Sequence, residues 1–175
     1  CIRDSNNPIP TIVEKNALRD FVLEVSRDRM VFVDEAYHEF VDNPDYSSMM
    51  DLVREGHRNI VIARTASKIH GLAGLRVGFG FSHPELAAEI NRRMTGTLNI
   101  VGMRAALASY RDKEHAAFVL RTNKEALEIT QGYFREAGIR HIDSNANFTF
   151  VETGHDIAEV QARFLEYNIR VGRPF

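Results

Sequence analysis

Residues 30–37 read MVFVDEAY, a short apolar run that is followed by two carboxylates and a tyrosine. The four apolar residues, Met30 to Val33, are too few for a helix, and they include two β-branched valines. Such a run predicts a strand that is buried on both faces and ends at Asp34. Because ligands of open α/β sheets bind beyond the carboxyl ends of the strands, a carboxylate at this point is a candidate site residue.

Similar runs and helical patterns alternate along the first half of the chain. NIVIART, residues 59–65, predicts a second buried strand over 59–64, and VGFGF, residues 77–81, predicts a third. Between residues 11 and 28, apolar side chains recur at the spacing of one helix face, at Leu18, Phe21, Val22 and Val25. This alternation predicts an α/β fold with a mostly parallel sheet flanked by helices.

The second half of the chain is mostly helical in pattern. Residues 99–139 predict a long helical stretch that breaks near Asp112. After it, 147–152 and 168–172 predict two strands with a helix over 156–167 between them. We expect this β-α-β tail to begin a second, smaller α+β domain.

Composition excludes several classes of function. The chain has 175 residues, 44% of them hydrophobic and 26% charged, which is typical of a globular protein. Its 22 basic and 24 acidic residues are interleaved and give a net charge of −2, so neither nucleic acid nor a membrane surface is an expected partner. No apolar run reaches the roughly 20 residues that span a bilayer. A small-molecule partner is expected instead.

The single cysteine and the two ends of the chain add two expectations. Cys1 permits no disulfide framework and no cysteine-based metal site, which is typical of the reducing cytoplasm. The sequence has no charged-then-apolar leader, does not begin with Met, and stops after RVGRPF. We therefore expect a piece of a longer cytoplasmic protein.

Cations follow the second predicted strand, in TASKIHGLAGLRVGF, residues 65–79. The chain order predicts that Lys68, Arg76 and the Asp34–Tyr37 pair converge at one edge of the sheet. Each residue also has a simpler explanation: Asp34 as a cap, Tyr37 as a core aromatic and Arg76 as a surface cation. The residues alone leave these alternatives open.

The order and spacing of DEAY, residues 34–37, and SKIHGLAGLRVG, residues 67–78, resemble the pyridoxal-phosphate site of the fold-type I aminotransferases. The histidinol-phosphate aminotransferase branch is the most similar, and the resemblance runs from NNP, residues 6–8, to RVGRPF at the end. It implies that residues 1–112 are the second half of the large cofactor-binding domain. Residues 113–175 would then be a linking helix and part of the small domain.

The resemblance implies a role for each candidate residue. Lys68 would form the Schiff base with pyridoxal phosphate and carry the proton, since a lysine amine becomes a nucleophile once it is deprotonated. Asp34 would pair with the protonated pyridine nitrogen and keep the ring an electron sink. Tyr37 and Asn7 would donate to the phenolic oxygen of the cofactor. Its phosphate would be held by Arg76, Thr65 and Ser67.

Some positions depart from the family pattern. The family reads N-P-N-N-P-T-G where this chain has RDSNNPIPT, residues 3–11, so Ile9 and Pro10 replace Thr and Gly. His70 stands where an aromatic or small residue is usual, and we expect it beside the site without a role. Arg173 resembles an arginine that lies near the substrate in this branch.

The implied reaction moves an amino group between an amino acid or amino-alcohol phosphate and a 2-oxo acid such as 2-oxoglutarate, in a homodimer. Two alternatives remain open on the sequence. One is a pyridoxal-phosphate decarboxylase of an amino-acid phosphate, which would share Lys68, Asp34 and Arg76. The other is a non-catalytic module of the same fold, either one that binds a ligand or an inactive relative.

Overall fold

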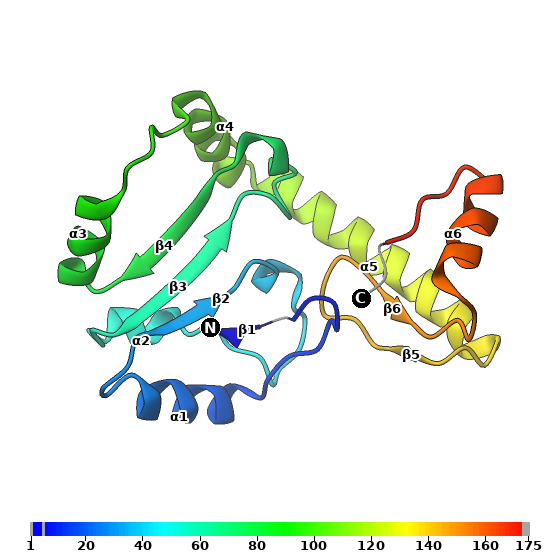
Figure 1. The fold of residues 1–175 in the computed structure, drawn as a ribbon, viewed down its shortest axis with the longest axis horizontal. Coiled ribbons are helices and arrows are strands. Elements are labelled where there is room, and N and C mark those ends of the chain that lie inside the picture. The colour runs from blue at the N-terminus through cyan, green and yellow to red at the C-terminus, as the bar shows by residue number, and fades with distance from the viewer. Residues whose placement is uncertain (1, 5, 173–175) are drawn as a thin grey trace.

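The computed structural model describes residues 2–4 and 6–172, and its centre is a four-stranded sheet in the order β1-β2-β3-β4 (Figure 1). The strands are β1 (Ile2–Arg3), β2 (Val31–Asp34), β3 (Ile60–Thr65) and β4 (Gly78–Ser82). The first three run parallel, and β4 pairs with β3 in the antiparallel direction. The α/β fold with a mostly parallel sheet is therefore confirmed.

The main apolar core lies between one face of this sheet and two helices, α1 (Lys15–Val25) and α2 (Met50–Arg54). Its buried members come from both helices, from the sheet and from the segment before α2: Leu18, Val22, Val31, Val33, Met49, Leu52, Ile60 and Ile62. Of the predicted helix face, Leu18 and Val22 are buried, whereas Phe21 is 51% exposed. The apolar stripe of α1 is therefore narrower than its spacing predicts.

The prediction that residues 30–33 are buried on both faces was wrong. Val31 and Val33 are buried, but Met30 is 63% exposed and Phe32 39% exposed. Successive side chains of a strand point to opposite faces, and α1 and α2 cover only one of those faces. The face that carries Phe32 borders the cavity described below.

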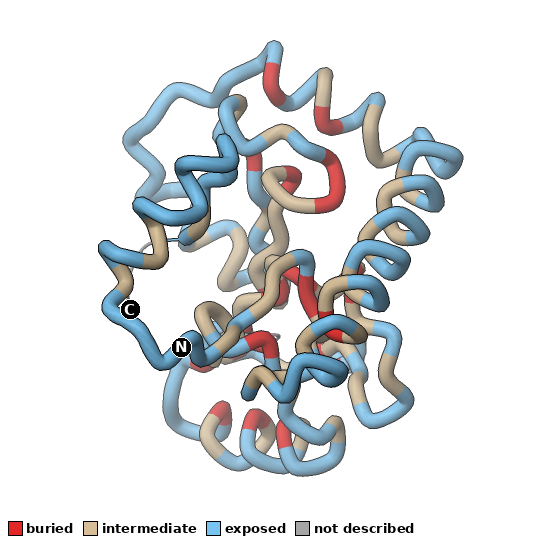
Figure 2. Tube along the Cα trace, turned by 90° about the vertical axis from the view of Figure 1, so that its right-hand side faces the viewer, coloured by how far each residue is buried: buried red, intermediate tan, exposed pale blue. Residues whose placement is uncertain are grey.

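Helices α3 (Pro84–Arg93), α4 (Ile100–Arg111) and α5 (Lys113–Glu136) follow β4, and α5 leads away from the sheet (Figure 1). The predicted break falls at Asp112, whose side chain accepts a hydrogen bond from the His115 amide at 2.9 Å and so caps α5. Most of the chain at the periphery is exposed, and the buried residues gather inside (Figure 2).

Beyond α5 lie β5 (His141–Ile142), β6 (Phe150–Val151) and α6 (Ile157–Glu166). β5 and β6 form an antiparallel pair. β6 lies within the strand predicted over 147–152, whereas the sequence pattern missed β5. Among the described residues, 168–172 form no strand, contrary to expectation. Their backbone bonds to α6 instead: the Ile169 amide donates to the Phe164 carbonyl, and Gln161 Nε2 donates to the Gly172 carbonyl.

Candidate functional site

The carboxyl ends of β2 and β3 meet beside a cavity of about 390 Å³. The register places Asp34, the last residue of β2, opposite Ala63, and β3 continues to Thr65. Five of the predicted site residues line this cavity: Asp34, Thr65, Ser67, Lys68 and Arg76. Because side chains alternate along each strand, Asp34 and Thr65 face away from the main core.

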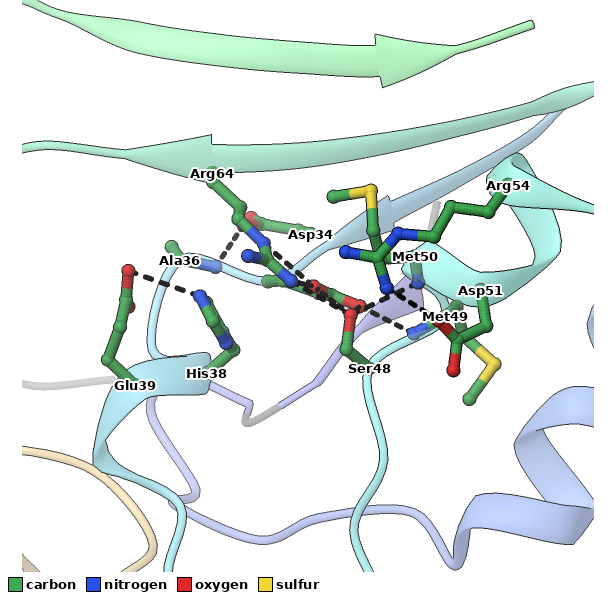
Figure 3. A network of polar contacts seen from close by, with 11 residues as sticks. Asp34, Ala36, His38, Glu39, Ser48, Met49, Met50, Asp51, Arg54 and Arg64 are labelled. Carbon is green, nitrogen blue, oxygen red and sulfur yellow. Dashed lines mark hydrogen bonds and ion pairs between the residues drawn. The ribbon is translucent and has the colours of Figure 1, made fainter.

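Asp34 is held by hydrogen bonds from both flanking segments. Its Oδ1 accepts from the Ala36 amide at 3.1 Å, and its carbonyl accepts from the Asp4 amide at 3.1 Å. The side chain therefore caps the turn that follows β2, as the simpler reading of the sequence expected, and it also borders the cavity (Figure 3). The capping interpretation of Asp34 is therefore confirmed, and its role as a site residue stays a prediction.

Lys68 connects the cavity to Tyr37 and Asn7. The Lys68 Nζ atom lies 4.6 Å from the centre of the Tyr37 ring, within the range of a cation–π contact. Asn7 Nδ2 donates to Tyr37 Oη at 3.2 Å. The tyrosine is 6% exposed, and its ring meets that of Phe148 edge-on at 5.3 Å. The structure thus brings Asn7, Tyr37 and Lys68 together, and Tyr37 is also a core aromatic.

Thr65, Ser67 and Arg76, which belong to the segment 65–79, also line the cavity. Thr65 Oγ1 lies 2.8 Å from Ser67 Oγ and accepts from the Ser67 amide at 3.0 Å. Arg76 follows the 3-10 turn η2 (Ala73–Leu75) and donates to the Ala73 carbonyl at 2.9 Å. Two hydroxyls and a guanidinium beside one cavity form a donor set that suits a phosphate.

Glycine is required at two places near this segment. Gly71 has φ +64, a conformation that side chains other than glycine rarely adopt. At Gly78, an added Cβ would lie 3.1 Å from the Arg64 carbonyl across the β3–β4 pair. Glycine thus permits the left-handed backbone at residue 71 and the close approach of two strands at residue 78.

A buried ion pair beneath the cavity was missed by the sequence analysis. Arg64 contacts the carboxylate of Glu35, which is 1% exposed and also accepts from Ser48 and the Met49 amide. Figure 3 shows Arg64 and Asp34 at the strand ends, with Ser48 and Met49 approaching from the segment before α2. No local pattern signalled this pair, because residues 30–33 are uniformly apolar, and only the structure shows that Glu35 continues the buried face of Val31 and Val33.

Asp4 is a second buried carboxyl without a predicted role. It follows β1, is 1% exposed, and its Oδ1 accepts from the Val13 amide at 3.0 Å. Burial raises the pKa of Asp4 to about 6, and the Glu35 carboxylate adds to this rise, whereas the bond from Val13 opposes it.

His70 lies next to the site, as predicted. It is 8% exposed, its Nδ1 is 2.8 Å from Ser109 Oγ, and its ring centre is 3.9 Å from that of Tyr110. Desolvation lowers the pKa of His70, which favours the neutral ring. These contacts attach residues 65–79, the lysine segment that contains Lys68, to α4. Arg173, the predicted substrate residue, lies outside the described residues.

The sequence model of the family described as aminotransferase class I and II matches residues 2–173. The chain belongs to this family. A histidinol-phosphate aminotransferase of Moorella thermoacetica is 36% identical to it over 167 residues, which are 95% of this chain and 43% of that protein. One from Akkermansia muciniphila is 39% identical over 154 residues, covering 87% and 42% respectively. This aminotransferase-family chain thus spans less than half the length of these two relatives.

Solved structures of aminotransferases share the fold. A structure described as a histidinol-phosphate aminotransferase from Erwinia carotovora atroseptica has a TM-score of 0.94 and 30% identity, over 99% of this chain and 51% of that one. The Sinorhizobium meliloti histidinol-phosphate aminotransferase in complex with pyridoxal-5'-phosphate has a TM-score of 0.83 and 22% identity, over 94% and 46%. The second likeness bears on the fold alone.

Proposed function

We propose that this chain carries the cofactor site of a pyridoxal-phosphate-dependent aminotransferase. The observation that supports the proposal is the single cavity at the carboxyl ends of β2 and β3, which Asp34, Lys68 and Arg76 line together. A carboxylate, an amine and a permanent cation match the pyridine nitrogen, the aldehyde and the phosphate of this cofactor. The donor set therefore fits the group.

The position of each side chain permits a specific role toward the cofactor. Pyridoxal phosphate, when bound, supplies an electron sink for the bond-breaking at the substrate carbon. Asp34, which lines the cavity, would hold a proton on the pyridine nitrogen by a charge-assisted bond, a type worth about 1.5–3 kcal/mol. Lys68 provides the amine that binds the aldehyde and moves a proton at the substrate carbon. Tyr37, oriented by Asn7, donates toward the phenolic oxygen.

The phosphate of the cofactor falls to Arg76, Thr65 and Ser67. A guanidinium presents planar N–H groups that match two phosphate oxygens at once, and the hydroxyls supply further donors. The hydroxyl oxygens of Thr65 and Ser67 lie 2.8 Å apart, so both hydroxyls can reach one anion without rearrangement of the backbone. This anchor would place the aldehyde within reach of Lys68.

The relatives guide the choice of substrate. Two proteins named histidinol-phosphate aminotransferases are 36% and 39% identical to this chain over most of its length. We infer an amino donor that resembles histidinol phosphate and a 2-oxo acid acceptor such as 2-oxoglutarate. Arg173 is proposed as the residue near the substrate. Every helix in the described part of the chain is too short or too polar to span a bilayer. As a separate proposal, we place the full-length protein in the cytoplasm as a homodimer.

A half-reaction tests the proposal. The full-length protein, saturated with pyridoxal phosphate, is mixed with histidinol phosphate and no 2-oxo acid, and its visible spectrum is followed. An aminotransferase converts the bound cofactor to its amine form, and 2-oxoglutarate then restores the original spectrum. Release of carbon dioxide from an amino-acid phosphate would favour a decarboxylase instead, and failure to bind pyridoxal phosphate would favour a non-catalytic module.

A further inference from the structure

Asp34 and Glu35 are neighbours in the chain, yet they serve opposite faces of the sheet, because side chains alternate along an extended strand. Asp34 lines the cavity, as does Phe32 two residues before it. Glu35 continues the buried face of Val31 and Val33, and it is 1% exposed. A carboxylate that continues an apolar face into a buried position must have partners there.

The Glu35 carboxylate is fully occupied by partners from two other segments. Arg64 Nε and Nη2 donate to its Oε2 at 3.1 and 2.9 Å. Ser48 Oγ lies 2.8 Å from the same oxygen, and the Met49 amide donates to Oε1 at 2.8 Å. Arg64 Nη2 also donates to Ser48 Oγ at 2.9 Å. The three side chains form a closed network (Figure 3).

This network lies where the sheet opens toward the cavity. The β2–β3 ladder ends with Asp34 opposite Ala63, and one further backbone bond joins the Glu35 amide to the Ala63 carbonyl at 2.9 Å. Arg64 lies between Ala63 and Thr65 in β3, four residues before Lys68. The network therefore joins the strand end that carries Asp34 to the strand end that leads to Thr65 and Lys68.

We propose that Glu35, Arg64 and Ser48 are positioning residues that fix the distance and angle between Asp34 and Lys68 across the cavity, an inference that rests on the proposed function. A guanidinium that contacts a carboxylate through two nitrogens fixes orientation as well as distance, which a lysine ammonium cannot do. Arg64 and Arg76 both line the cavity. Because the Arg64 guanidinium is bound to Glu35, we assign the phosphate to Arg76.

The test uses Arg64→Lys in the full-length protein, because this change keeps the charge and removes the two-nitrogen contact. Arg54→Lys is the matched control, since Arg54 is 74% exposed and pairs with Asp51 on the surface. Pyridoxal phosphate is titrated into each apo protein well below its melting temperature, and the pH midpoint of the bound chromophore is measured. We expect Arg64→Lys to weaken affinity about tenfold or more and to shift that midpoint, because small misplacements at a site are costly.

Arg54→Lys should match the parent within about twofold, a change below 0.5 kcal/mol. If Arg64→Lys does not fold, Ser48→Ala decides, because it removes one hydroxyl and keeps the ion pair; about threefold weaker binding and a shifted midpoint are then expected. A role in stability alone predicts a lower melting temperature with parental affinity and midpoint, and that result overturns the inference. A parent protein that binds no pyridoxal phosphate overturns the proposed function as well.

Discussion

Arg76, the proposed phosphate anchor, has a left-handed backbone conformation, since its φ is 57°. Arg76→Ala removes the guanidinium and should weaken cofactor binding, and excess pyridoxal phosphate should restore part of the activity. Arg76→Gly should lose the same affinity for the cofactor. Its free energy of unfolding should be about 1 kcal/mol higher than that of Arg76→Ala, because glycine tolerates this φ. Cofactor titration and chemical denaturation measure the two effects. No rescue in either variant would mean that Arg76 holds the fold instead.

Asp4 predicts a pH dependence of stability. Burial raises the pKa of Asp4 from 3.8 to about 6, so the folded state binds this proton more tightly than the unfolded state. The contribution of this group is complete below pH 3.8 and is lost as the pH rises through about 6. Asp4→Asn can still accept the bond from the Val13 amide and carries no charge.

The melting temperature of Asp4→Asn should therefore exceed that of the parent at about pH 7.5, and the two should converge toward about pH 4. Thermal unfolding across this range, monitored by circular dichroism, measures the difference. The sequence control is Asp28→Asn, because Asp28 is an exposed partner of Arg29. Parallel curves for the parent and Asp4→Asn would show that Asp4 ionises normally in the folded protein.

At the level of single residues, the sequence predicted the cavity-facing set because strand ends and a recognisable spacing located Asp34, Lys68 and Arg76. It did not predict Glu35 and Arg64 as a pair. Their contact depends on the register of β2 against β3, which no local pattern specifies. Sequence also could not separate Asp34 as a cap from Asp34 as a site residue, because one side chain both caps the turn and borders the cavity.

At the level of elements, α4 is attached to the lysine segment at its first turn. Asn99 Oδ1 accepts from the Gly102 amide at 3.0 Å, and Asn99 Nδ2 donates to the Leu75 carbonyl at 3.0 Å. A Cβ added at Gly102 would lie 2.8 Å from Asn99 Nδ2 and 2.9 Å from Val77 Cγ2. The helix can pack this closely only because residue 102 has no side chain.

Gly102→Ala should therefore lower the free energy of unfolding by about 1–3 kcal/mol, as overpacking does, despite the higher helix propensity of alanine. Gly132→Ala is the matched control, because Gly132 lies within helix α5 and nothing lies within 4 Å of a Cβ added there. Urea denaturation of both variants measures the difference. A stability for Gly102→Ala equal to or above that of the parent would contradict the packing described here.

Elements with strong local signals were predicted well, and those that depend on distant partners were not. The break at Asp112 was found because a capping side chain marks it. Ser82 and Glu85 have the three-residue spacing of a helix capping box. Ser82 nevertheless ends β4, and His83 is the residue that caps α3. β6 lies within the strand predicted over 147–152, but its partner β5 has only two residues, too few for a periodic signal. The expected strand over 168–172 bonds to α6 instead.

At the level of the whole molecule, the division into 1–112 and 113–175 stays a prediction. One core cluster contains residues from both sides of this boundary, because Tyr37, Phe40 and Ile69 pack with Ala146 and Phe148. Limited proteolysis of the full-length protein tests the division. We expect early cleavage near residue 112 if the two parts separate easily, and protection there if the shared cluster makes them one folding unit.

The proposed homodimer is also argued at this scale. Apolar side chains are exposed along α4 and the segment before it: Met94, Leu98, Ile100, Val101, Met103 and Leu107. Val101, 74% exposed, should lie in the interface, so Val101→Asp should shift sedimentation from dimer toward monomer. Phe21→Asp, at a 51% exposed position on α1, is the control. A parent protein that sediments as a monomer would contradict the proposed assembly.

The most direct measurement of the central claim is borohydride reduction of the cofactor-saturated, full-length protein, followed by peptide mapping. We predict a pyridoxyl group on Lys68, because this amine lines the cavity with Asp34 and Arg76. Lys68→Ala should keep the fold, lose the visible absorption band and the adduct, and turn over several orders of magnitude more slowly. A pyridoxyl group on Lys15, Lys113 or Lys124, or none at all, would contradict the claim that this cavity is the cofactor site.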